Sequence, residues 1–358
     1  MVGRPGQQCL PANISSELRD PDCMEEPGKS TDRNHALDFT KGALILFMIL
    51  YHWINYFVGI GGPVFTYLRV IPPSFIFITG FLIVNLYPTK YGFSGPKAYE
   101  RLIFRGLKLL VLFTVLNLIA NAFFVRSYSR AMPGVDGFLR DAATIYISGN
   151  IKAVFGILIP ISYLLLLSTG IFLVGQVYKH SIPLVCAALF FLIAFLELHG
   201  LSTSHLTLIG IGLLGLVAGF FPTERIDAWV DHPSVIVCLN IGYIFAISIW
   251  EISYLPQAIG VCLSVILIYL TGMKTADWGG IRSTIILLGK YSLFGYIAQI
   301  GLLQLLHRGL PYLNLDKWEL WVISFVGAFA LTIMIVKVVH NFRAKSRSVD
   351  WLYRVVFT

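Results

Sequence analysis

Two ionisable side chains stand in the apolar stretch LDFTKGALILFMILYHW, residues 37–53: Lys41 near its start and His52 near its end. A helix rises about 1.5 Å and turns about 100° per residue, so the eleven steps from Lys41 to His52 place them about 16 Å apart along the axis and about 20° apart around it. The two side chains therefore share one helix face. The cation could hold the anionic end of a long substrate while the imidazole acts as a general base at its reactive end.

Two further polar residues, Asp38 and Asn55, fall near the same stripe. A plainer interpretation stays open. A buried neutral histidine can simply bond a backbone carbonyl or a tyrosine such as Tyr51 or Tyr56, and a lysine at the end of an apolar run is an ordinary anchor at the membrane surface.

A second cationic group stands at the start of the apolar run at 104–124. Arg101, Arg105 and Lys108 are spaced i, i+4 and i+7, which places them on one helix face. Cations oppose the dipole at a helix N-terminus, where anions are favoured, so the stripe predicts a docked anion such as phosphate. The alternative is a topology signal in contact with lipid headgroups.

The apolar run at 282–306 is unusually polar for its length. It contains Lys290, Ser292, Tyr296, Gln299 and Gln304. Because polar groups at membrane depth are costly, this density predicts that the run lines a cavity and does not face lipid.

The elements that would position these residues are membrane-spanning helices. The chain has 358 residues, of which 56% are hydrophobic and only 13% charged. Crossing a bilayer as a helix takes about 20 apolar residues. We therefore predict an all-α, polytopic integral membrane protein of about ten spans, at 41–60, 68–87, 104–124, 153–178, 182–198, 205–222, 234–252, 255–271, 282–306 and 319–341.

Charge patterning gives the expected orientation. With the N-terminus inside, the inner segments hold most of the Lys and Arg residues, so both termini are predicted to be cytoplasmic. Residues 1–35 are polar, and we predict that they form a disordered cytoplasmic arm. We predict a membrane domain at residues 36–341 and a basic cytoplasmic tail at residues 342–358. The net charge of +8 then reflects topology and anionic lipid, with no nucleic-acid binding, and the expected location is the plasma membrane.

The sequence lacks the motifs of several common kinds of catalytic and binding site. It has no Gly-rich nucleotide loop, no nucleophile elbow and no zinc-type His/Glu pattern. The five cysteines show neither metal-ligand spacing nor a disulfide framework. We expect no bound metal.

Four segments resemble, in order, motifs of the transmembrane acyltransferase-3 family and its wider superfamily, which includes glucan O-acyltransferases and heparan-α-glucosaminide N-acetyltransferase. DFTKG (38–42) with His52 resembles the family's Asp-x-x-Arg-Gly element and its later histidine, with lysine in the place of arginine. FIFITGFLI (75–83) is similar to FFxxSGFLI, and RLIFR (101–105) to RRLLR. GKYSLFGYIAQ (289–299) is similar to GxxSxxxYxxH, with Gln299 where many members have histidine.

The resemblance implies acyl transfer from cytoplasmic acyl-CoA, with acetyl-CoA as the first expectation, to a hydroxyl or amine of an extracytoplasmic acceptor such as a glycan. The CoA phosphates would lie near Lys41, Arg101, Arg105 and Lys108. His52 would act as general base or transient acyl carrier, and Asn55, Ser292 and Tyr296 would orient the imidazole or bind the thioester oxygen.

Two rival functions remain open at this point. A transporter or flippase could use His52, Lys290 and the 282–306 helix as a polar pathway, although the chain shows no repeat between its halves of the kind that transporters often have. A membrane sensor or scaffold without catalytic activity is the other.

Overall fold

The computed structural model describes residues 34–59, 63–91, 96–124, 141–149, 154–176, 181–221, 233–250, 253–313 and 316–357. Within these ranges every regular element is a helix. Most of the predicted arm at 1–35 lies outside the described residues. The longer helices are α1 His35–Trp53, α3 Ile71–Tyr91, α4 Pro96–Phe124, α6 Leu158–Gly175, α7 Ser181–Leu198, α8 Ser204–Gly219, α10 Pro233–Ile249, α11 Tyr254–Lys274, α12 Gly279–Lys290, α13 Ser292–Gly309, α14 Lys317–Lys345 and α15 Arg347–Phe357.

Shorter pieces connect them. A π-helical turn, η1 Ile54–Val58, continues α1, and α2 Pro63–Leu68 follows it. The others are the π-helical turn η3 Thr144–Ser148 and two 3₁₀ turns, η5 Ala276–Trp278 and η6 Leu310–Leu313.

The all-helical architecture and its long apolar helices are those of a multi-pass membrane protein. Seven helices in the described part of the chain are long and apolar enough to span a bilayer, and the number rises to eight if the bent pair α12–α13 counts as one span. Two further runs expected to span coincide with the shorter apolar helices α8 and α10, of 16 and 17 residues. At about 1.5 Å per residue these reach about 24–26 Å, slightly less than a typical hydrocarbon core.

Glycines set the closest helix contacts. A Cβ on Gly42 of α1 would overlap the carbonyl oxygen of Ile285 in α12, and one on Gly289 of α12 would overlap the carbonyl oxygen of Asp38. The two backbones therefore touch directly, as small residues allow in membrane helix pairs. In this way DFTKG and GKYS, distant in the sequence, become neighbours.

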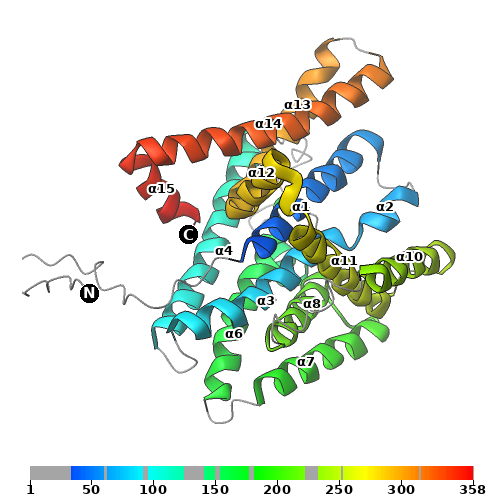
Figure 1. Cartoon of the computed structure of the whole chain (residues 1–358). Helices are drawn as coiled ribbons and strands as arrows, with labels where there is room; N and C mark the ends of the chain where they lie inside the picture. Colours follow the sequence, from blue (N-terminus) through cyan, green and yellow to red (C-terminus); the bar gives the residue numbers. More distant parts are fainter. Residues whose placement is uncertain are drawn as a thin grey trace, which may run out of the picture. The chain divides into compact units, whose positions relative to one another are not determined.

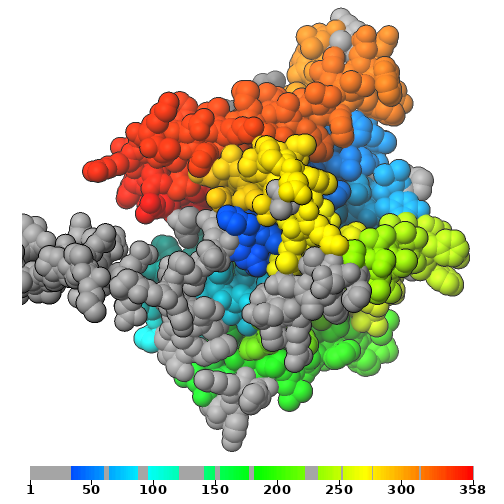
Figure 2. Space-filling view, viewed as in Figure 1, coloured from blue at the N-terminus to red at the C-terminus, as the bar shows by residue number. Residues whose placement is uncertain are grey.

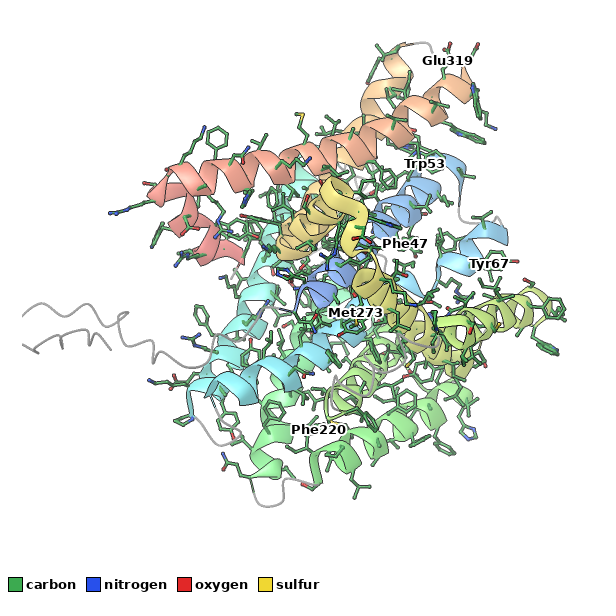
Figure 3. All side chains as sticks on the ribbon, in the orientation of Figure 1. Phe47, Trp53, Tyr67, Phe220, Met273 and Glu319 are labelled. Carbon is green, nitrogen blue, oxygen red and sulfur yellow. The ribbon has the colours of Figure 1, made fainter. Side chains whose placement is uncertain are left out.

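Helix α1 lies at the centre of this arrangement (Figure 1). It packs against α3, α11, α12, α13 and α14. Its C-terminal end is tied to α14, because the indole Nε1 of Trp53 donates a 2.8 Å hydrogen bond to the hydroxyl of Ser324 (Figure 3).

The prediction of one continuous span at 282–306 is wrong. Helices α12 and α13 meet at Tyr291 with a bend of 93°. Tyr291 has φ −108° and ψ 29°, outside the helical region, and Gly289, two residues before it, lowers helix propensity. Gly289 is also held against α1, and Ser292 is the first residue of α13 after the bend.

A last helix folds back after the long helix α14. Helix α14 ends at Lys345, and α15 begins two residues later at Arg347. The inner face of α15 contacts the bend: the ring centroid of Tyr353 lies 5.2 Å from that of Tyr291, and the ring of Phe357 lies 5.4 Å from that of Phe294. Residues 347–357 of the predicted basic tail therefore form a helix packed on the α12–α13 bend, and residues 342–345 are the last residues of α14.

Candidate functional site

A cavity of about 210 Å³ lies between α1, α3, α4, α6 and α13. Its wall is mostly aliphatic and aromatic. Six polar or charged residues interrupt that wall: Lys41, Thr79, Tyr87, Arg105, Ser292 and Tyr296. The cavity is smaller than the usual ligand pocket of about 300–1,000 Å³, so it suits a narrow chain better than a whole nucleotide.

Two cations reach this cavity from different helices. The ammonium group of Lys41 lies 2.7 Å from a carboxylate oxygen of Asp38, one turn earlier in α1. Asp38 is 3% exposed, so its charge needs this partner. The pair is close to neutral, and Arg105 therefore supplies most of the positive field on an incoming anion.

Arg105 is held toward the cavity by a tyrosine. Its Nη1 lies 3.5 Å from the hydroxyl oxygen of Tyr87, which is also on the cavity wall. A guanidinium can bind a phosphate through two parallel hydrogen bonds, which a lysine cannot do.

His52 lies beside another part of the same wall. Its ring centroid is 6.4 Å from that of Tyr296, which lines the cavity, and 5.2 Å from that of Tyr51. Since α1 is continuous from His35 to Trp53, the axial separation of about 16 Å between Lys41 and His52 holds.

If His52 had a purely structural role, a ring nitrogen would be hydrogen-bonded, as one is in two other histidines of the chain. Nε2 of His205 lies 2.7 Å from the carbonyl oxygen of Ile145, and Nδ1 of His340 lies 3.0 Å from the hydroxyl of Tyr291. His52 forms no hydrogen bond of this kind with any residue that the structure describes, and the hydroxyl of Tyr56 instead accepts one from Gln304. The described surroundings of His52 thus leave its ring nitrogens available to a ligand.

The predicted site residues divide into two groups. Lys41, Arg105, Ser292 and Tyr296 line the cavity, with His52 next to Tyr296. Asn55, Arg101 and Lys108 are outside its wall. Asn55 lies in the π-helical turn η1, Arg101 is exposed, and Lys108 donates a 3.2 Å hydrogen bond to the backbone carbonyl of Arg354 in α15.

The anion site expected at a helix N-terminus needs correction. Helix α4 begins at Pro96, so Arg105 stands more than two turns inside it. The field of the helix terminus falls off within the first turn. Any anion at Arg105 is therefore bound by the guanidinium and its neighbours, without help from the helix dipole.

Sequence reasoning missed two polar residues of the wall, Thr79 and Tyr87 on α3. The hydroxyl of Thr79 also donates to the carbonyl of Phe75, so it is partly occupied. Tyr87 lies near the end of an apolar run, where aromatic residues are common at membrane surfaces. Its position in the sequence therefore did not indicate that it lines a cavity.

Gln299 lies three residues beyond Tyr296 and is fully buried. Neither atom of its side-chain amide has a hydrogen-bond partner among the described residues. An unpaired buried amide costs about 1–3 kcal/mol, so this position is one that a water molecule or a ligand group would satisfy.

The donor set of the site is cationic and hydroxylic. In the described part of the chain no three His, Cys, Asp or Glu side chains gather as metal ligands would. The arrangement can bind an anionic head, hold a narrow chain in the mostly apolar cavity and present the hydroxyl groups of Ser292 and Tyr296. The imidazole of His52 lies next to Tyr296, with 6.4 Å between the ring centroids.

Comparison with known proteins adds no assignment. The chain matches no protein-family model, and no curated protein is significantly similar to it.

Proposed function

We propose that this protein is a membrane acyltransferase, of the class that transfers groups other than aminoacyl groups. It moves an acyl group, acetyl as the simplest case, from acyl-CoA to a hydroxyl or amine of an acceptor such as a glycan. The observation that carries this proposal is the cavity itself, which has Arg105, Lys41 and Tyr296 on its wall, with the ring of His52 next to that of Tyr296.

The shape supports an acyl-CoA better than a compact metabolite. The pantetheine arm is narrow and suits a cavity of about 210 Å³. The nucleotide is too large for that volume and would stay outside, with its phosphates against Arg105 and Lys41. The thioester would then lie near Tyr296.

The chemistry is a single acyl substitution. The imidazole of His52 accepts the proton from the acceptor's hydroxyl or amine as that atom attacks the thioester carbon. A hydroxyl of Ser292 or Tyr296 donates to the thioester oxygen as negative charge develops there. The carbon–sulfur bond breaks, and the CoA thiolate takes up the proton.

The proposal includes a topology. It places ten spans in the plasma membrane, with α8 and α10 as short spans, α12–α13 as a broken one and both termini in the cytoplasm. The acceptor then enters from the extracytoplasmic side, opposite acyl-CoA.

A transporter remains the second candidate, since an apolar cavity with a cationic wall also suits an anionic lipid. The two functions differ in whether a thioester is bound and cleaved.

Acetyl-CoA binding to the purified protein in detergent tests the proposal. We expect Arg105→Ala to weaken binding about tenfold, since a hydrogen bond to a charged group contributes about 1.5–3 kcal/mol. Arg101→Ala, four residues earlier on the same helix and outside the cavity wall, is the matched control and should change binding less than twofold. Absence of acetyl-CoA binding by the wild-type protein would favour transport.

A further inference from the structure

A second basic region, separate from the cavity, lies where α14 turns into α15. A basin of about 420 Å³ is lined there by Arg343, Lys345, Arg347, Asp350 and Arg354, together with Ala344 and Trp351. Four cations thus surround a single carboxylate. Figure 2 shows the end of α14 and α15 as an exposed red surface.

The carboxylate is already shared by two of these cations. Nη2 of Arg343 lies 2.5 Å from Oδ1 of Asp350, and Nη2 of Arg354 lies 2.8 Å from Oδ2. Lys345 and Arg347 are exposed and form no ion pair with any other described residue. The basin therefore carries an excess of positive charge that an anion would neutralise.

The position of the basin indicates which anion it meets. Helix α14 has 29 residues and is apolar enough to span a bilayer. Its length of about 44 Å exceeds a hydrocarbon core of about 30 Å, so its ends reach the headgroup layer. The basin begins at the last residues of α14 and thus lies at the depth of the lipid phosphates.

The outer face of α15 is apolar beside these charges. Trp351, Leu352 and Val355 are 66%, 56% and 49% exposed, and they lie at i, i+1 and i+4 on the helix. A helix with an apolar face, basic flanks and an exposed tryptophan is typical of one that lies in the plane of the membrane surface.

We propose that the α14–α15 elbow is a binding site for the phosphate of an anionic phospholipid. Lys345 and Arg347 contact the phosphate, while Trp351, Leu352 and Val355 enter the acyl-chain boundary. The inner face of α15 rests on the α12–α13 bend through Tyr353, which contacts Tyr291 next to Ser292. Lipid binding therefore stabilises the helix that packs against the start of α13.

The test uses the full chain in nanodiscs of phosphatidylcholine with graded amounts of phosphatidylglycerol, and counts retained phosphatidylglycerol by native mass spectrometry. We expect Lys345→Ala/Arg347→Ala to reduce retention about tenfold, because each cation near an anionic surface adds appreciably to attraction. Arg308→Ala/Lys317→Ala is the matched control: it removes one exposed arginine and one exposed lysine near the other end of α14 and should change retention less than twofold.

A second measurement does not depend on any charge substitution. The fluorescence of Trp351 is measured as the difference between the wild type and Trp351→Phe. Brominated phospholipid should quench this fluorescence, and inorganic phosphate in solution should not relieve the quenching. Equal retention by the Lys345/Arg347 variant and the wild type would overturn the proposal, as would displacement of the lipid by free phosphate. Carbodiimide cross-links from Lys345 to the acidic residues of the segment 20–26, unaffected by phosphatidylglycerol, would assign the basin to that segment and also overturn it.

Discussion

His52 is the residue on which the proposed chemistry depends. We expect His52→Ala to lower acetyl-CoA-dependent acyl transfer by at least a hundredfold, since a positioned general base contributes about 10²–10⁴-fold. Acetyl-CoA binding should change little, because the proposed phosphate contacts are to Arg105 and Lys41 and not to His52. Release of free CoA thiol measures the reaction. His199→Ala, an exposed histidine immediately after the end of α7, is the control and should retain full activity.

Lys41 has a different expected behaviour from Arg105, although both face the cavity. Because Lys41 already neutralises the buried carboxylate of Asp38, Lys41→Met should destabilise the fold as well as weaken CoA binding. Lys41→Arg should keep the ion pair and at least preserve binding, since its guanidinium can also hold phosphate. Thermal unfolding in detergent separates the two effects. A Lys41→Met protein that melts as the wild type does would contradict this role.

At the scale of single elements, the contact between α1 and α12 can be tested by adding one methyl group. Gly42→Ala would overlap the carbonyl of Ile285, so it should destabilise the protein by about 1–3 kcal/mol and lower its melting temperature. Gly170→Ala in α6 meets no atom within 4 Å and should be neutral or slightly stabilising, because alanine favours a helix over glycine. Equal melting temperatures for the two variants would refute the close α1–α12 approach.

The α14–α15 elbow should show its own pH dependence. The hydrogen bond from Arg343 lowers the pKa of Asp350 below its usual value of 3.8, with Arg354 adding to the effect. This contribution to stability is present above the ordinary pKa and is lost as the pH falls through the lowered one. Burial raises the pKa of Tyr353 to about 12, so its contribution is present below about pH 10 and is lost as the pH rises toward 12.

Docking of α15 should therefore be constant from about pH 5 to pH 9 and weaken outside that window. The fluorescence of Trp351, taken as the difference between wild type and Trp351→Phe, reports it. Asp350→Asn should remove the weakening of docking at low pH and leave the weakening at high pH unchanged. If docking of α15 still weakens at low pH in Asp350→Asn, another titrating group is responsible for that weakening.

Sequence patterns within one helix predicted the arrangement of α1 but not the break between α12 and α13 or the start of α4. The shared face of Lys41 and His52 follows from helix geometry within one element, so the sequence was sufficient. The break at Tyr291 lies two residues after Gly289, which packs against α1, and a hydropathy window registers neither the break nor this tertiary contact. The start of α4 at Pro96 was misjudged for a related reason, because its first turns are polar and lie outside the apolar run.

For the whole molecule, helical class and multiple candidate spans follow from composition, whereas the cavity required knowing which helices meet. Arg105, Tyr87 and Ser292 come from three helices, and no spacing in the sequence relates them. The proposed topology remains open to a direct test: reporters fused to either terminus should both be active on the cytoplasmic side. An extracytoplasmic C-terminus would reverse the placement of α15 and of the α14 end.

Acetyl transfer across the membrane tests the central proposal most directly. Vesicles containing the protein would receive isotopically labelled acetyl-CoA at their cytoplasmic face, and the glycans and lipids of the opposite face would be analysed by mass spectrometry. We predict a labelled acetyl group on an extracytoplasmic acceptor with the wild type and His199→Ala, and its absence with His52→Ala. Equal labelling with and without His52, or no labelling by the wild type in its native membrane, would contradict the account.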